Sequence, residues 1–151
     1  MKRFSIAARL FFLAVGSPIW VGDFSEPRLA HGQSPGGGVT DRAGLVSKLR
    51  AAGADVEIVG EVDQPFLSVS GTMIKLQGED VQVFQYSNAA QMEAEAKLIS
   101  PNGTTVGTRK IHWIGAPHFF KQGRVLVLYV GNDKKVEKAL ETALGRQFAG
   151  Q

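Results

Sequence analysis

The stretch HWIGAPHFFKQGRVLVLYVG, residues 112–131, decides the fold of this chain. Its second half is apolar at every position from Val125 to Val130. A strand that is apolar on both faces lies in the middle of a sheet, because each face needs a covering layer. We therefore predict a central strand over Val125–Val130, which the chain enters through a turn at Gln122-Gly123.

The first half of the stretch predicts two shorter strands on either side of a break. Gly115-Ala116-Pro117 interrupts the pattern, and such a cluster marks a turn or loop. We expect one strand over residues 110–114, before the break, and another over residues 118–121, after it. A hairpin over residues 110–121 would then precede the central strand.

The chain upstream continues the antiparallel pattern. Val56, Ile58 and Val62 alternate with polar residues and predict a half-buried strand. Short strands are expected over residues 66–69 and 72–76, and a tight turn at Gly78-Glu79 makes residues 72–86 a hairpin.

Three helices with apolar stripes and end signals complete the pattern. The first has a cap at Thr40 or Asp41, a stripe at Leu45, Val46, Leu49 and Ala52, and a stop at Gly53; the second has a cap at Asn88 and a stripe at Met92, Ala96 and Ile99; the third follows Gly131-Asn132-Asp133, with a stripe at Val136, Leu140, Ala143 and Leu144 and a stop at Gly145. Residues 101–109 are expected to form a loop, mobile or lying over the sheet.

These elements follow the coarse order αβββαβββα. Consecutive hairpins indicate an antiparallel sheet, so we predict an α+β fold: a two-layer domain, an antiparallel sheet with helices packed on it. The domain is expected to span residues 40–150 as a single unit.

The N-terminus has the order of a secretory signal. Lys2, Arg3 and Arg9 precede the apolar residues 10–15, and Pro18 interrupts the segment before it is long enough to span a bilayer. We predict a signal peptide over residues 1–32, cleaved after Gly32, and a flexible Gly-rich linker over residues 33–39. The protein is therefore expected to be exported to the periplasm, the cell envelope or the extracellular medium, with membrane contact only through an uncleaved leader.

Charge and cysteine content exclude several classes of function. The chain has 17 Lys and Arg against 14 Asp and Glu, and without residues 1–32 the balance falls to 13 against 12. Nucleic-acid binding needs clustered basic residues, but the only adjacent basic pairs of the mature chain are Arg109-Lys110 and Lys134-Lys135, so no nucleic-acid partner is expected. The absence of cysteine excludes disulfides and thiol catalysis.

The segments LRAAGADVE, GEVDQPF, GEDVQVFQY, HWIGAPHFFKQGRVLVLYVG and LGRQFAG resemble a family of short, uncharacterised bacterial exported proteins, many of them lipoproteins. The resemblance covers roughly residues 40–150. It implies a cell-envelope location and carries no activity or ligand residues. This chain departs from the lipoprotein pattern because its leader has no cysteine to acylate.

Two histidines are the candidates for chemistry. His112 and His118 lie on either side of the break and would face each other in a hairpin. They are weak candidates for a metal site, which needs three or more converging ligands, and His118 is a weak candidate for acid–base catalysis. No catalytic residue and no cofactor is assigned.

The aromatic residues of the same stretch suggest a binding surface. Phe119 and Phe120 point to opposite faces of their strand, so one ring needs cover from a helix or loop. Either residues 101–109 lie over that ring, or it belongs to a surface formed by Trp113, His118, Phe119 and Phe120 that binds an envelope protein or a small apolar ligand. We expect a non-enzymatic binding or accessory module; the alternative is a small hydrolase or metal-binding protein that uses His112 and His118.

Overall fold

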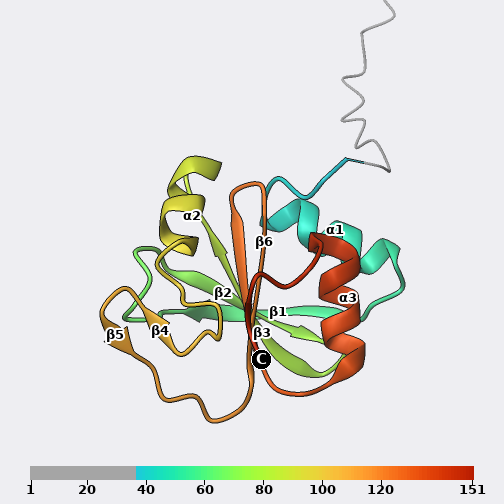
Figure 1. The fold of residues 1–151 in the computed structure, drawn as a ribbon. Helices are drawn as coiled ribbons and strands as arrows, with labels where there is room; N and C mark the ends of the chain where they lie inside the picture. The colour runs from blue at the N-terminus through green and yellow to red at the C-terminus, as the bar shows by residue number, and fades with distance from the viewer. Residues whose placement is uncertain (1–36) are drawn as a thin grey trace, which may run out of the picture. The chain divides into compact units, whose positions relative to one another are not determined.

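The computed structural model describes residues 37–151, which form an α+β domain (Figure 1). In chain order the elements are α1 (Arg42–Ala51), β1 (Val56–Val62), β2 (Gly71–Leu76), β3 (Glu79–Gln85), α2 (Ala89–Ala96), β4 (Thr105–Val106), β5 (Arg109–Lys110), β6 (Pro117–Gln122), β7 (Val125–Val130), α3 (Lys134–Leu144) and β8 (Ala149–Gly150). The predicted signal peptide, residues 1–32, and most of the predicted linker lie outside the described residues. Val39, at the end of that linker, is buried in the core.

Six strands form one antiparallel sheet in the order β1-β2-β3-β7-β6-β8. β7 lies inside this sheet between β3 and β6, and its residues from Val125 to Tyr129 are buried. The prediction of a central strand over Val125–Val130 is therefore confirmed, and so is the α+β class with an antiparallel sheet and packed helices.

Helices cover both faces of the sheet. α1 and α3 pack on one face, where Leu45, Leu140 and Phe120 belong to the same apolar cluster. α2 packs on the opposite face, where Met92 and Phe119 belong to a second cluster. The paired strands β4 and β5 contribute to this second cover (Figure 1). The sheet therefore lies between α1 and α3 on one side and α2 on the other, and each face with its helices forms two layers.

The helix starts follow the predicted signals, whereas α2 ends at Ala96, and Ile99 of its predicted stripe lies outside the helix in a bridge to Val106. Asp41, Asn88 and Asp133 are the N-caps, and each side chain accepts a hydrogen bond from a backbone N–H of the first helical turn. Gly53 and Gly145 follow α1 and α3 with φ of +83° and +90°. Glycine adopts such angles without the clash that a Cβ would cause.

Two predicted strands are absent from the described residues. Residues 66–69 form turns and bends, and residues 111–116 contain no strand. The strand expected over residues 110–114 shrinks to β5, which pairs with β4 in a separate two-stranded sheet. The hairpin expected over residues 110–121 is therefore wrong, because β6 pairs with β7 and β8 instead.

Residues 101–109 lie over the sheet, as one of the two alternatives proposed. Val106 of β4 is buried in the same cluster as Phe119. Gly103 lies so close to Phe119 that an added Cβ would sit 3.1 Å from the ring. No helix among residues 37–151 is long and apolar enough to cross a membrane.

Candidate ligand-binding groove

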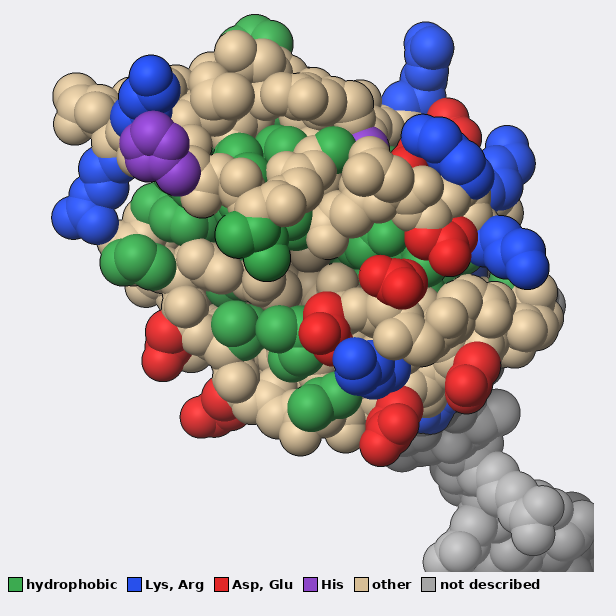
Figure 2. Space-filling view, turned by 90° about the horizontal axis from the view of Figure 1, so that it is seen from below, with side chains coloured by type: hydrophobic (Ala, Val, Ile, Leu, Met, Phe, Trp, Pro, Cys, Tyr) green, Lys and Arg blue, Asp and Glu red, His purple; other side chains and the backbone are tan. Residues whose placement is uncertain are grey.

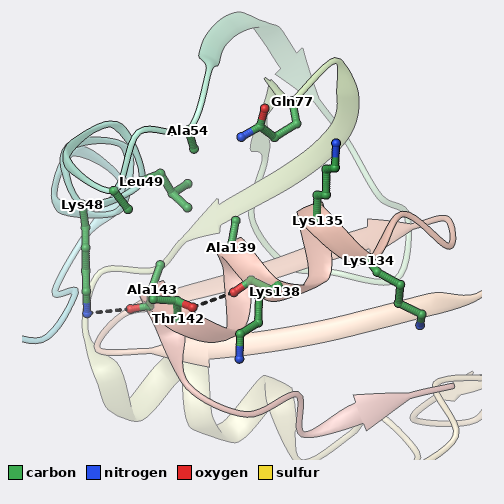
Figure 3. A pocket seen from close by; sticks show the side chains of 11 residues that line it. Lys48, Leu49, Ala54, Gln77, Lys134, Lys135, Lys138, Ala139, Thr142 and Ala143 are labelled. Carbon is green, nitrogen blue, oxygen red and sulfur yellow. Dashed lines mark hydrogen bonds between the residues drawn. The ribbon is translucent and has the colours of Figure 1, made fainter.

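A groove of about 620 Å³ opens between α1, α3 and the turn that joins β2 to β3 (Figure 3). Its size falls within the range of small-molecule sites in proteins. The lining residues are Lys48, Leu49, Ala52, Ala54, Gln77, Lys134, Lys135, Lys138, Ala139, Thr142 and Ala143. They combine an apolar floor with a basic rim.

The floor of the groove consists of Leu49 and small side chains. Leu49 from α1 and Ala139 from α3 lie opposite each other in Figure 3. Leu49 is buried, and Ala54 and Ala139 are partly buried against the core beneath the α1 and α3 face. The alanines leave space between the two helices that larger side chains would fill.

The lysines of the rim differ in their partners. Lys48 donates a hydrogen bond of 2.9 Å to the carbonyl of Ala143, which joins α1 to the last turn of α3. Lys134 pairs with Glu137 at 2.8 Å, and Lys138 pairs more loosely at 3.7 Å with a glutamate one turn further along α3. Among the described residues, the Lys135 ammonium group has no hydrogen bond or ion pair within the protein, and no Asp or Glu lines the groove.

Gln77 closes one end of the groove in an unusual backbone conformation. Its φ is +54°, the only positive φ of a non-glycine residue in the described part of the chain. Residues other than Gly, Asn and Asp adopt this region at a cost, and such strain is often found at functional sites. In Figure 3 the Lys135 side chain extends toward the side of the groove where Gln77 lies, whereas Lys134 and Lys138 leave the opposite side of α3.

Basic side chains also mark the α3 side of the domain in the space-filling view. In Figure 2 several of them lie at the right, the side on which α3 lies in Figure 1, with acidic side chains among them, and others lie at the left. A groove with a basic rim and an apolar floor attracts ligands that are themselves amphipathic and negatively charged.

His118 is a buried packing residue. Only 2% of it is exposed, and its ring stacks on Tyr129 at 5.7 Å between centroids and 21° between planes. Nε2 donates to the carbonyl oxygen of Gly131 at 2.9 Å, and Nδ1 lies 2.7 Å from Oε1 of Gln147. Glu137 Oε1 lies 3.7 Å from Nε2. Both ring nitrogens therefore have partners inside the protein.

The structure does not bring the two histidines together as hairpin partners. His112 is exposed in the segment before β6, and His118 pairs with Tyr129 and Gly150 in the sheet. Among residues 37–151, no three His, Asp or Glu side chains lie close enough together to hold a metal ion.

The predicted aromatic surface is wrong, because its phenylalanines are buried. Phe119 is 0% exposed and Phe120 is 2% exposed. Trp113 covers Phe119 in an edge-to-face contact of 5.9 Å, and its Nε1 donates to the carbonyl of Gly103 at 2.7 Å. Trp113, Phe119 and the buried His118 are therefore part of the core, and they present no continuous face to a partner.

Another group of polar side chains, Ser68, Glu95 and Tyr86, has a structural role. Glu95 of α2 accepts hydrogen bonds from the backbone N–H of Ser68 at 2.7 Å and from its hydroxyl at 2.5 Å. Tyr86 lies nearby with its hydroxyl buried and without a hydrogen bond, and burial, followed by the charge of Glu95, raises the pKa of this phenol. Through its bonds to Ser68, Glu95 joins α2 to the loop before β2.

One sequence feature that could have pointed to the groove lies in the turn between β2 and β3. Gln77-Gly78 precedes β3 at a two-residue turn whose first position favours Asn, Asp or Gly. A glutamine there is a departure from turn preference and points to a role for its side chain.

No protein-family model matches this chain, and no curated protein or solved structure is significantly similar to it.

Proposed function

We propose that this protein is an exported module of the cell envelope that binds a ligand, without enzymatic chemistry, in the groove between α1 and α3. The observation that carries the proposal is the combination of an apolar floor at Leu49 and Ala139 with a Lys135 ammonium group that has no partner among residues 37–151. Binding sites of this kind place few polar groups around an apolar cavity.

The lining chemistry favours binding over catalysis. The residues that line the groove include no histidine, carboxylate, serine or cysteine. The only lining hydroxyl, on Thr142, donates to the backbone carbonyl of Lys138 at 2.8 Å. Among the described residues, the groove therefore holds no hydroxyl or thiol that is hydrogen-bonded to a general base, the arrangement that nucleophilic hydrolysis uses.

The test is to map ligand contacts by amide chemical-shift perturbation in residues 33–151. Small molecules of several classes, including alkyl carboxylates, alkyl amines, sugars, nucleotides and short peptides, are titrated one at a time. We expect at least one class to shift amides of α1, of the Gln77 turn and of α3 together. If no class shifts these amides, or if all shifts fall on other elements, the proposal fails.

Ala139→Phe is the blocking variant, because its ring would fill the floor beside Leu49. Ala94→Phe is the matched control, because Ala94 is an exposed residue of α2 on the opposite face of the sheet. Ala139→Phe should abolish the groove shifts while Ala94→Phe keeps them. Thermal melting followed by circular dichroism checks that both variants are folded.

A further inference from the structure

We infer that the ligand of this groove is an amphipathic anion: a single negatively charged head group, carboxylate or phosphate, on an unbranched aliphatic chain. This inference rests on the proposed function and adds the chemical class of the ligand. The head lies at the Gln77 and Lys135 end of the groove, and the chain lies along Leu49 and Ala139.

The head group must be an anion because of what surrounds it. Lys48, Lys134, Lys135 and Lys138 line the groove, and no Asp or Glu among residues 37–151 does. A cationic head at the Gln77 end would lie beside the Lys135 ammonium group, which repels it. Lys134 and Lys138 already pair with carboxylates of α3, so Lys135 is the lysine that can take a ligand anion without breaking a pair.

Gln77 adds a neutral donor to the same end. An amide group donates through its NH₂, and a head group held by one ammonium and one amide is a small anion with few oxygens. The positive φ of Gln77 holds this side chain at the groove in a conformation that glycine would adopt more easily. Gln77 and Gly78 are the two central residues of the β2–β3 turn, which needs positive φ at both positions, and this turn places the Gln77 amide at the end of the groove.

The body of the ligand must be aliphatic and slender because of the floor. No aromatic side chain lines the groove, so neither a nucleobase nor a sugar ring finds the stacking surface that it usually needs. The floor offers Leu49 and four alanines, and between the two ends the apolar side chains provide no hydrogen-bonding partner for a polar ligand body. An alkyl chain satisfies these conditions, because it needs burial and no hydrogen bonds.

The experiment measures the affinity of residues 33–151 for four probes by isothermal titration calorimetry, below the micelle concentration of each. Dodecanoate and dodecyl phosphate carry the two anionic heads, dodecyltrimethylammonium carries a cationic head on the same chain, and butanoate carries the carboxylate on a short chain. We expect at least one dodecyl anion to bind at least about tenfold more tightly than both the cation and butanoate. The better anion identifies the head group.

Lys135→Glu should weaken binding of the dodecyl anion by about tenfold or more and strengthen binding of the cation. Lys110→Glu is the matched control, because Lys110 is an exposed lysine of β5, which belongs to the cover of the opposite sheet face. Lys135→Met provides a second variant that removes the charge without adding a repulsive one, and it should reduce the preference for the anion.

Three results would overturn the inference: equal affinity for the dodecyl anions and the dodecyl cation, no effect of Lys135→Glu in a folded variant, or groove shifts produced only by another class such as acidic peptides. In the last case the groove still binds a ligand, and the proposed function stands while the ligand class is wrong. If no probe of any class shifts the groove, both fail together.

Discussion

At the scale of single residues, His118 shows how a chemically versatile side chain is committed to structure. Its two ring nitrogens hold Gly131 and Gln147, and its ring stacks on Tyr129. Gly131 is needed at that contact, because a Cβ there would lie 2.4 Å from the Tyr129 hydroxyl. The histidine thus joins β6, the turn before α3 and the C-terminal segment, and it has no free nitrogen to offer a substrate.

Gln77→Gly should separate the effect of this residue on the stability of the protein from its effect on ligand binding. Glycine removes the cost of the positive φ, so we expect the free energy of unfolding to rise by about 1 kcal/mol in urea denaturation. The same variant lacks the amide, so its affinity for the dodecyl anion should fall in calorimetry.

Gly78→Ala is the control for this prediction. Gly78 has φ of +87° with nothing within 4 Å of an added Cβ, so the substitution strains the same turn without touching the groove. It should lower the free energy of unfolding by about 1 kcal/mol and leave the affinity unchanged. A Gln77→Gly protein that is less stable than the parent would show that the side chain is held for packing.

At the scale of elements, the position of a strand in the sheet explains which predictions of exposure hold. β1 is one of the two edge strands of the six-stranded sheet, and Ile58 and Val59 are each 55% exposed although alternation predicts Ile58 inside. A bulge between Ile58 and Gly60 interrupts the pairing with β2. Bulges and charged residues such as Glu57 and Glu61 are typical of edge strands, where they oppose pairing with another chain.

β7 is the element on which the sheet depends, and Leu128→Ala tests this. Leu128 is 0% exposed in the cluster beneath α2, so the truncation should lower the free energy of unfolding by about 2 to 5 kcal/mol. Val59→Ala on β1 is the control and should cost far less, because that side chain is already half exposed. Both values come from urea denaturation.

Native-state hydrogen exchange gives an independent measurement of the same element. Backbone amides of β7 bond to β3 and β6 on its two sides, so they should exchange only through global unfolding. Rapid exchange along Val125–Val130 would show that this strand opens locally and is not the centre of the sheet.

At the scale of the whole molecule, export is the prediction that lies beyond the described residues. The basic residues Lys2, Arg3 and Arg9 ahead of an apolar segment motivate it. Mass spectrometry of the protein isolated from its native host should find a mature chain that starts near Gln33. An intact Met1 on a soluble species from the cytosol would contradict the signal peptide and with it the envelope location.

The packing of the domain is apolar on both faces of the sheet. Its two apolar clusters share the sheet, and alternate residues of β7 belong to one or the other. The chain contains no cysteine. The apolar burial on both faces of β7 is therefore the main source of the stability of residues 37–151.

Much of the fold could be predicted from sequence because its signals are local. Asp41, Asn88 and Asp133 lie within three residues of the N–H groups that they cap. The uninterrupted apolar run of Val125–Val130 likewise indicates a strand covered on both faces without knowledge of its neighbours. Residues 66–69 misled the same reasoning, because their apolar side chains pack as a loop against the second cluster and do not form a strand.

The sequence by itself determined the helix starts, the central strand and the α+β class, because each depends on residue types a few positions apart. Only the tertiary structure decided that His118, Phe119 and Phe120 are buried and that a groove exists beside Lys135. The groove depends on α1 meeting α3, and the Lys48–Ala143 hydrogen bond that joins them spans 95 residues of chain. Local patterns carry no information about which distant elements become neighbours, so the candidate site appeared only when the chain was folded.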